Sequence, residues 1–240
     1  MSTISSALPG EERWLLPEGV EELLAQTIQV ALELKLIKPQ ELSRVIVDTT
    51  VQEKAIAHPT DSRLLETARV KLVDAAKDAG IDLKQTFAKE GKELRRKAGG
   101  YAHAKQFKRL RKTVKRQRTI LGVLMREVQR KLDAQTQAVA TAGQPEREPS
   151  GPTALGELQM WLQRAERIRT QQRHDKNKLY ALHAPEVECI GKGKARKPYE
   201  FGVKVSLAVT HKQGLMVGAR SFPGNPFDGH ILSAQIEQTT

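Results

Sequence analysis

Two kinds of hydrophobic periodicity divide the chain. Apolar residues recur every three or four positions over residues 20–34 and again over much of residues 60–170, which predicts amphipathic helices. From residue 199 the period changes to two, which predicts strands. The predicted order is helix, strand, large helical insertion, hairpin, loop and helix, and we find no internal repeat within it.

Short breaker sequences set the ends of the first helices. The helix over residues 20–34 should close near Lys38-Pro39, because proline cannot continue it. The cluster Thr60-Asp61-Ser62 predicts the start of a second helix, which runs to Ala79 with Gly80 just beyond its end.

A long third helix is predicted over residues 101–140, at roughly 60 Å. Its apolar seam has a spacing near 3.5 residues, as in coiled coils, and consists of Phe107, Leu110, Val114, Leu121, Leu124, Val128 and Leu132, with Gln117 at one seam position. The stretch Ala140–Thr153 is rich in Ala, Gly, Pro and Thr and predicts an exposed linker. A second apolar stripe over residues 155–168 follows, so we expect an antiparallel helical hairpin over about residues 101–175.

Three strands are predicted. The β-branched segment Arg44–Val51 is typical of a buried strand, and residues 199–219 form a hairpin around a turn at 211–214. Asp228 is a good N-cap for a last helix, which ends near Gln238. The fold class is therefore α/β, mostly helical by residue count, with three antiparallel strands and the last helix on one face of the sheet.

These elements predict three regions. Residues 1–18 are an irregular N-terminal segment, residues 19–60 and 199–240 form the α/β core, and residues 61–198 form a basic helical insertion. Because no strand is predicted beside residues 44–51 on their other side, this strand should be an open edge.

Positive charge is concentrated in the insertion. The 240 residues hold 40 lysines and arginines against 28 acids, but Lys89 to Lys131 alone holds 16 against three glutamates. Such an excess predicts a polyanionic partner, usually nucleic acid and less often an anionic membrane surface. The alternative is a solvated helix face. The eight residues predicted to contact DNA phosphates are Lys105, Lys108, Arg109, Arg111, Lys112, Lys115, Arg116 and Arg118.

The sequence shows no sign of export or membrane insertion. No apolar run reaches the ~18–20 residues of a membrane-spanning helix, and the N-terminus has no apolar signal region. Cys189 is the single cysteine, which excludes a disulfide framework and a cysteine-based zinc site. We therefore expect a soluble protein of a reducing cytoplasm.

Asp48 is the candidate for metal chemistry. An unpaired acid within Val-Ile-Val-Asp-Thr-Thr-Val would cost several kcal/mol if it were buried, so a metal or catalytic role is one interpretation. A carboxylate capped locally by Thr49 or Thr50 is the other. Asp61 and Asp228 are better explained as helix-capping residues, and His58 and His230 as ordinary loop residues.

Several segments resemble one protein family in both order and spacing. They are Val-Asp-Thr-Thr-Val-Gln-Glu-Lys at 47–54, Ile-Ala-His-Pro-Thr-Asp at 56–61, the basic helix around 105–121, Lys-Pro-Tyr-Glu-Phe-Gly at 197–202, and Pro-Gly-Asn-Pro-Phe-Asp-Gly-His at 223–230. From about Gly19 to Thr239 the chain is similar to bacterial insertion-sequence DDE transposases, whose catalytic core is RNase H-like.

The resemblance implies DNA transposition by metal-assisted phosphoryl transfer. In that family two Asp and one Glu hold two Mg²⁺ ions, which activate the nucleophile and stabilise the leaving oxygen. Asp48 corresponds to the first acid, and the other two, together with an upstream DNA-binding region, have no counterpart here. We therefore expect a fragment that is inactive alone and does not hold Mg²⁺ tightly.

The implied partners are the DNA ends of an insertion element, together with a second copy or an intact transposase, at the bacterial nucleoid in the cytoplasm. The alternative function is a non-enzymatic helical protein that binds nucleic acid and acts as a repressor or competitor.

Overall fold

The chain is a mixed α/β protein that divides into two compact units. The computed structural model describes residues 17–142, 151–191, 193, 195 and 197–239. Met1–Glu53 and Ile190–Thr240 form one unit, here called the sheet unit, and Lys54–Cys189 form the other, the helical unit. The hydrophobic pattern predicts this helical part at residues 61–198, so both of its ends lie a few residues earlier in the structure.

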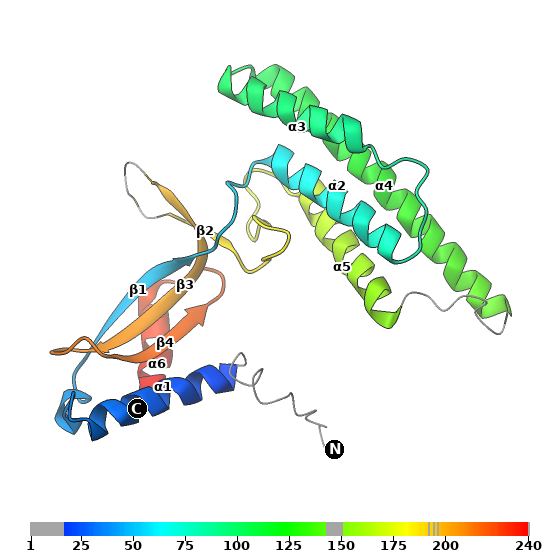
Figure 1. The fold of residues 1–240 in the computed structure, drawn as a ribbon. Coiled ribbons are helices and arrows are strands. Elements are labelled where there is room, and N and C mark those ends of the chain that lie inside the picture. The colour runs from blue at the N-terminus through cyan, green and yellow to red at the C-terminus, as the bar shows by residue number, and fades with distance from the viewer. Residues whose placement is uncertain (1–16, 143–150, 192, 194, 196, 240) are drawn as a thin grey trace. The chain divides into compact units, whose positions relative to one another are not determined.

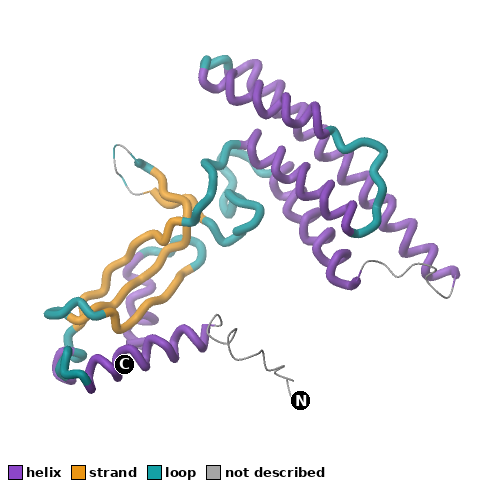
Figure 2. The backbone as a smooth tube through the Cα atoms, in the orientation of Figure 1, coloured by secondary structure: helices purple, strands orange, loops and turns teal. Residues whose placement is uncertain are grey.

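Four antiparallel strands build the sheet (Figures 1 and 2). They are β1 (Val45–Glu53), β2 (Glu188–Gly191), β3 (Tyr199–Thr210) and β4 (Met216–Phe222). The long strand β3 pairs with β1, with β2 and with β4. The predicted strand and hairpin are confirmed, but the prediction of three strands is wrong because β2 was missed. The four residues of β2, which end at Gly191, are too few for a visible alternation.

Strand β1 lies at an edge of the sheet. It pairs with β3 in a continuous register from Val45 opposite Thr210 to Glu53 opposite Gly202. Within the described part of the chain β1 has no second strand neighbour, as the sequence predicts. Its exposed N–H and C=O groups could therefore accept another strand.

Helix α6 (Asp228–Thr239) lies against the sheet and contacts β1, β3 and β4, which confirms the predicted placement of the last helix. On β3, Ser206, Ala208 and Thr210 are almost fully buried and alternate with half-buried residues, so one face of the strand is the covered one. Helix α1 (Pro17–Glu33) contacts β4, and a short 3-10 turn at Pro39–Glu41 follows it.

Four helices form the helical unit: α2 (Asp61–Asp78), α3 (Ala88–His103), α4 (Phe107–Ala142) and α5 (Gly151–Thr170). Helix α2 packs against the other three, and α3 packs against α4. Thr60 caps α2 by accepting the backbone N–H of Arg63, and Gly80 has the left-handed φ of 71° expected just past a helix end. Leu72, Leu121, Leu124, Val128 and Leu158 are fully buried in one core.

The predicted long helix is broken. Residues 101–140 do not form one helix, because α3 ends at His103 and α4 begins at Phe107, with Lys105 between them at φ 54°. The seam is nevertheless confirmed over Leu121–Val128, whereas Phe107 is 58% exposed. Gln117 occupies the seam by donating a hydrogen bond of 3.2 Å to the carbonyl of Ser62 on α2.

The predicted helical hairpin is part of a larger bundle that includes α2. Helices α4 and α5 do contact each other, but α2 packs against both, and residues of all three helices form one core. Most of the predicted linker, Ala140–Thr153, lies outside the described residues.

Candidate functional site

Four cations on α4 form an exposed surface, here called the basic face: Lys108, Arg111, Lys112 and Lys115. At 100° per residue these positions lie on the side of the helix opposite the seam through Leu121 and Leu124. All four are exposed, and none of them makes an ion pair with another described residue. They can therefore neutralise an external anion without first breaking an internal bond.

Two of the eight predicted contacts, Arg116 and Arg118, lie next to acidic residues of the protein itself. Arg116 donates two hydrogen bonds, of 2.7 and 3.0 Å, to the carboxylate of Glu90 on α3. This bond lowers the pKa of Glu90 and raises the pKa of Arg116, so both stay charged at neutral pH. Arg118 is half-buried, lies 3.5 Å from the carboxylate of Asp61 and donates to the carbonyl of Gln171. Arg116 and Arg118 therefore connect α4 to neighbouring segments, and their contact with DNA stays a prediction.

The other two predicted contacts lie where α3 meets α4. Lys105 occupies the break itself and is exposed. Arg109 donates a hydrogen bond of 3.0 Å to Gln106, and its guanidinium lies 5.9 Å from the ring centre of Tyr101. Both side chains remain accessible, but the orientation of Arg109 is already set by its neighbours.

The basic face continues further along α4 than the sequence predicted. Arg126 and Arg130 are exposed and follow Lys108, Lys112 and Lys115 at helical spacing on the same side. The sequence contained this signal, because the positions are i+11 and i+15 from Lys115. Thr119 and Gly122 interrupt the charges between the two groups, which hid the continuity.

Asp48 lies in the middle of β1, and its side chain is exposed. Burial alternates along β1, so the prediction of a buried strand is wrong for the face of β1 that carries Asp48. The carboxylate accepts a hydrogen bond of 2.8 Å from the backbone N–H of Thr49, which is the local capping that the sequence left open. Because Asp48 is exposed on an edge strand, its second carboxylate oxygen remains available to a cation.

Asp48 and Asp228 point to opposite faces of the sheet. Thr49, the next residue after Asp48, faces Ser206 on the covered side, whereas Asp48 faces Leu207 on the other side. Asp228 is the first residue of α6 rather than its N-cap, and its carboxylate forms an ion pair with Lys204. Lys204 also donates to the carbonyl of Pro226 at 2.6 Å. Asp228 is therefore engaged in fixing α6 on the sheet.

A small cavity of about 180 Å³ lies beside this ion pair. Its lining includes Thr49, Val51, Lys204, Asn225 and Asp228. Because the carboxylate of Asp228 forms an ion pair with Lys204, it does not offer free oxygens in this cavity to a metal ion. Across the described residues, we find no group of three His, Cys, Asp or Glu side chains arranged to hold one.

The remaining candidates show no reactive environment. Asp61 opens α2 and faces Arg118, and the ring of His230 packs edge-on against Phe227 at 5.6 Å. Burial raises the pKa of the Cys189 thiol, which makes it a poor nucleophile.

The fold and these surfaces define a class: a mixed α/β protein whose helical unit carries an exposed basic face on α4. One curated protein is similar in sequence, the "Uncharacterized protein ORF8 in nfe locus" of Rhizobium meliloti, at 50% identity over 91 residues. That match covers 38% of this chain and 44% of the relative, so the chain spans less than half of the relative's length. No family model and no solved structure matches the chain. None of the described helices is both long enough and apolar enough to cross a bilayer.

Proposed function

We propose that this chain is a DNA-binding protein of the insertion-sequence transposase family, and that its helical unit binds the DNA backbone. The observation that carries the proposal is the basic face of α4, where four exposed cations have no acidic partner among the described residues. Unscreened like charges at helical spacing destabilise an isolated helix. Phosphate groups remove that repulsion, and contacts to phosphate position a protein without reading the bases.

The sheet unit supports the family assignment. The strand that carries Asp48 pairs with the long strand β3, which pairs with β4, and α6 packs on them; this arrangement supports an RNase H-like core. In an RNase H-like core, a further strand would add to the open edge of β1 and bring the second acid to Asp48. Asp48 is exposed on that edge strand, with one carboxylate oxygen bound to a backbone N–H. Metal-dependent phosphoryl transfer with Mg²⁺ is the activity we propose for a protein that carries all three acids.

The alternative, a non-enzymatic competitor or repressor that binds nucleic acid, is favoured by a different observation. The helical unit has its own buried core from α2, α4 and α5 and does not need the sheet to bury these residues. Binding by the basic face and catalysis at Asp48 are therefore separable, and each needs its own test.

Binding is tested by neutralising the basic face. We expect Lys108→Gln, Arg111→Gln, Lys112→Gln and Lys115→Gln together to weaken binding to unrelated duplexes alike. The slope of log K against log salt should shrink by about four, roughly one for each phosphate that the variant no longer neutralises. Fluorescence anisotropy with labelled duplexes of two sequences measures both quantities.

The matched control removes four exposed cations elsewhere, with Lys35→Gln, Lys38→Gln, Lys176→Gln and Lys212→Gln. It changes the net charge equally but should leave the salt slope almost unchanged. Equal reductions in affinity for the two variants would mean that net charge alone, and not the basic face, attracts DNA.

Asp48 is tested by Asp48→Asn. We expect the melting temperature to be unchanged, because Asp48 is exposed and an asparagine oxygen can still accept the Thr49 N–H. In a protein that carries all three acids, transposition should be abolished, because the metal ions require the negative charge. Thermal unfolding and a transposition assay in cells separate the two roles. A lowered melting temperature together with retained transposition would identify Asp48 as a structural residue.

A further inference from the structure

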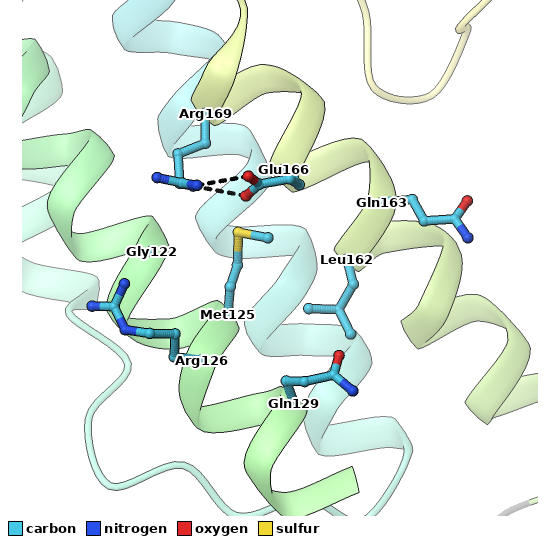
Figure 3. A pocket seen from close by; sticks show the side chains of 8 residues that line it. All are labelled: Gly122, Met125, Arg126, Gln129, Leu162, Gln163, Glu166 and Arg169. Carbon is cyan, nitrogen blue, oxygen red and sulfur yellow. Dashed lines mark hydrogen bonds and ion pairs between the residues drawn. The ribbon is translucent and has the colours of Figure 1, made fainter. Parts of the chain in front are cut away.

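A cavity between α4 and α5 combines two arginines with an apolar floor (Figure 3). Its volume is about 360 Å³, and we call it the arginine pocket. The residues that matter for its chemistry are Gly122, Met125, Arg126, Leu162, Glu166 and Arg169. It lies on the same side of α4 as the basic face, about 16 Å further along the helix axis from Lys115 to Arg126.

Glu166 fixes the orientation of Arg169 but binds only two of its three guanidinium nitrogens. Its carboxylate accepts hydrogen bonds of 2.7 Å from Nε and 2.6 Å from Nη2 of Arg169. The pair lowers the pKa of Glu166 and raises the pKa of Arg169, so the ion pair persists at neutral pH. Nη1 of Arg169 has no acceptor among the described residues and remains available to a ligand.

Both arginines of the pocket lie next to Gly122. A Cβ atom at this position would lie 3.4 Å from Nη1 of Arg126 and 3.9 Å from Nη1 of Arg169. Both groups therefore border the space beside residue 122, which a larger side chain at this position would fill. A glycine inside a helix costs roughly 1 kcal/mol relative to alanine, so this space has an energetic cost.

The local charges favour an anion. The pocket lining holds two guanidinium groups and one carboxylate, which pairs with Arg169, while Arg126 makes no ion pair with any residue that the structure describes. Two converging guanidiniums offer the geometry that favours phosphate oxygens. In Figure 3, Met125 lies below the Arg169–Glu166 pair and Leu162 reaches toward the same space from α5, so the floor can pack against an apolar group.

We propose that the arginine pocket binds one backbone phosphate of a nucleic acid, with the attached sugar against Met125 and Leu162. The assignment rests on the proposed DNA-binding function and adds a discrete contact site to the basic face. Arg126 and Nη1 of Arg169 hold the phosphate, and Glu166 acts as a positioning residue for Arg169. The pocket fixes the place of one phosphate along α4, whereas the basic face attracts the rest of the strand.

Filling the space without changing any charge gives the sharpest test. Gly122→Leu places a good helix-forming side chain between the two guanidiniums, and Val123→Leu enlarges an exposed neighbour outside the pocket. We expect the full chain with Gly122→Leu to bind a labelled duplex roughly 10- to 100-fold more weakly, as when hydrogen bonds to a charged group are removed. Val123→Leu should bind like the unchanged chain.

A second pair of variants covers the case in which Gly122→Leu does not fold. Arg126→Gln removes a pocket cation, and Arg130→Gln removes the next cation on the same side of α4, which does not line the pocket. Arg126→Gln should weaken binding clearly more than Arg130→Gln does, because it removes a directed contact in addition to a charge.

The outcomes separate this inference from the proposed function. If the unchanged chain binds no DNA, both fail. If it binds DNA and neither Gly122→Leu nor Arg126→Gln weakens binding beyond its control, only the pocket assignment is overturned. Inorganic phosphate at constant ionic strength provides the last arm. If phosphate binds in the pocket while the DNA affinity of Gly122→Leu is unchanged, the pocket takes a free anion and the inference is wrong.

Discussion

Raising the salt concentration from about 50 to about 200 mM should weaken binding of the chain to duplex DNA about 10³-fold. Four cations of the basic face, together with Arg126 and Arg130, give about six phosphate contacts. Each contact displaces condensed counterions from the DNA, and added salt opposes that release, so log K should fall with log salt at a slope near −5. Arg116 and Arg118 are not counted, because they are held by Glu90, Asp61 and Gln171.

Fluorescence anisotropy across a salt series, on two duplexes of unrelated sequence, measures this slope. Similar slopes on both are expected, since phosphate contacts carry no sequence information. An affinity that does not change with salt would contradict backbone binding. Vesicles of anionic lipid are the informative competitor, because preferential binding to them over DNA would favour a membrane surface as the polyanionic partner.

The hydrophobic pattern predicted the elements better than their ends and partners. The hairpin β3–β4, the cap at Thr60 and the seam at Leu121–Val128 followed from periodicity and local chemistry. The break at Lys105 did not, because its left-handed backbone is set by how α3 turns onto α4, and lysine gives no local signal for it. Strand β2 is stabilised by its pairing with β3, which a four-residue pattern cannot reveal.

The candidate site was predictable as a charged segment and not as individual contacts. Net charge alone cannot distinguish Lys112, which is free of ion pairs among the described residues, from Arg116, whose partner Glu90 is 26 residues away. Likewise, the exposure of Asp48 depends on which face of β1 is covered, and α6 decides that from the far end of the chain. Long-range packing thus determines which charges bind a ligand and which stabilise the fold.

Replacing Gly91 by alanine should destabilise the helical unit, although alanine is the better helix former. A Cβ atom there would lie 2.3 Å from Oε2 of Glu66 and 2.6 Å from Nε of Arg69, which is far inside van der Waals contact. These two residues form a buried, doubly hydrogen-bonded ion pair, with bonds of 3.0 and 2.7 Å, and Arg69 also donates to the carbonyl of Thr86 at 2.8 Å. The side chains of Arg69 and Glu66 are only 5% and 8% exposed, respectively. Neither can therefore move into solvent unless α3 moves away from α2.

Disrupting a buried ion pair costs about 3–5 kcal/mol, and the gain in helix propensity recovers about 1 kcal/mol of it. We therefore expect Gly91→Ala to lower the free energy of unfolding by about 2–4 kcal/mol, measured by urea denaturation followed by circular dichroism at 222 nm. Gly99→Ala is the matched control in the same helix, because a Cβ atom at Gly99 meets nothing within 4 Å. That control should be neutral or stabilise α3 by up to about 1 kcal/mol, from propensity alone. Similar effects of the two substitutions would show that α3 is not held against α2 through Gly91 and the Glu66–Arg69 pair.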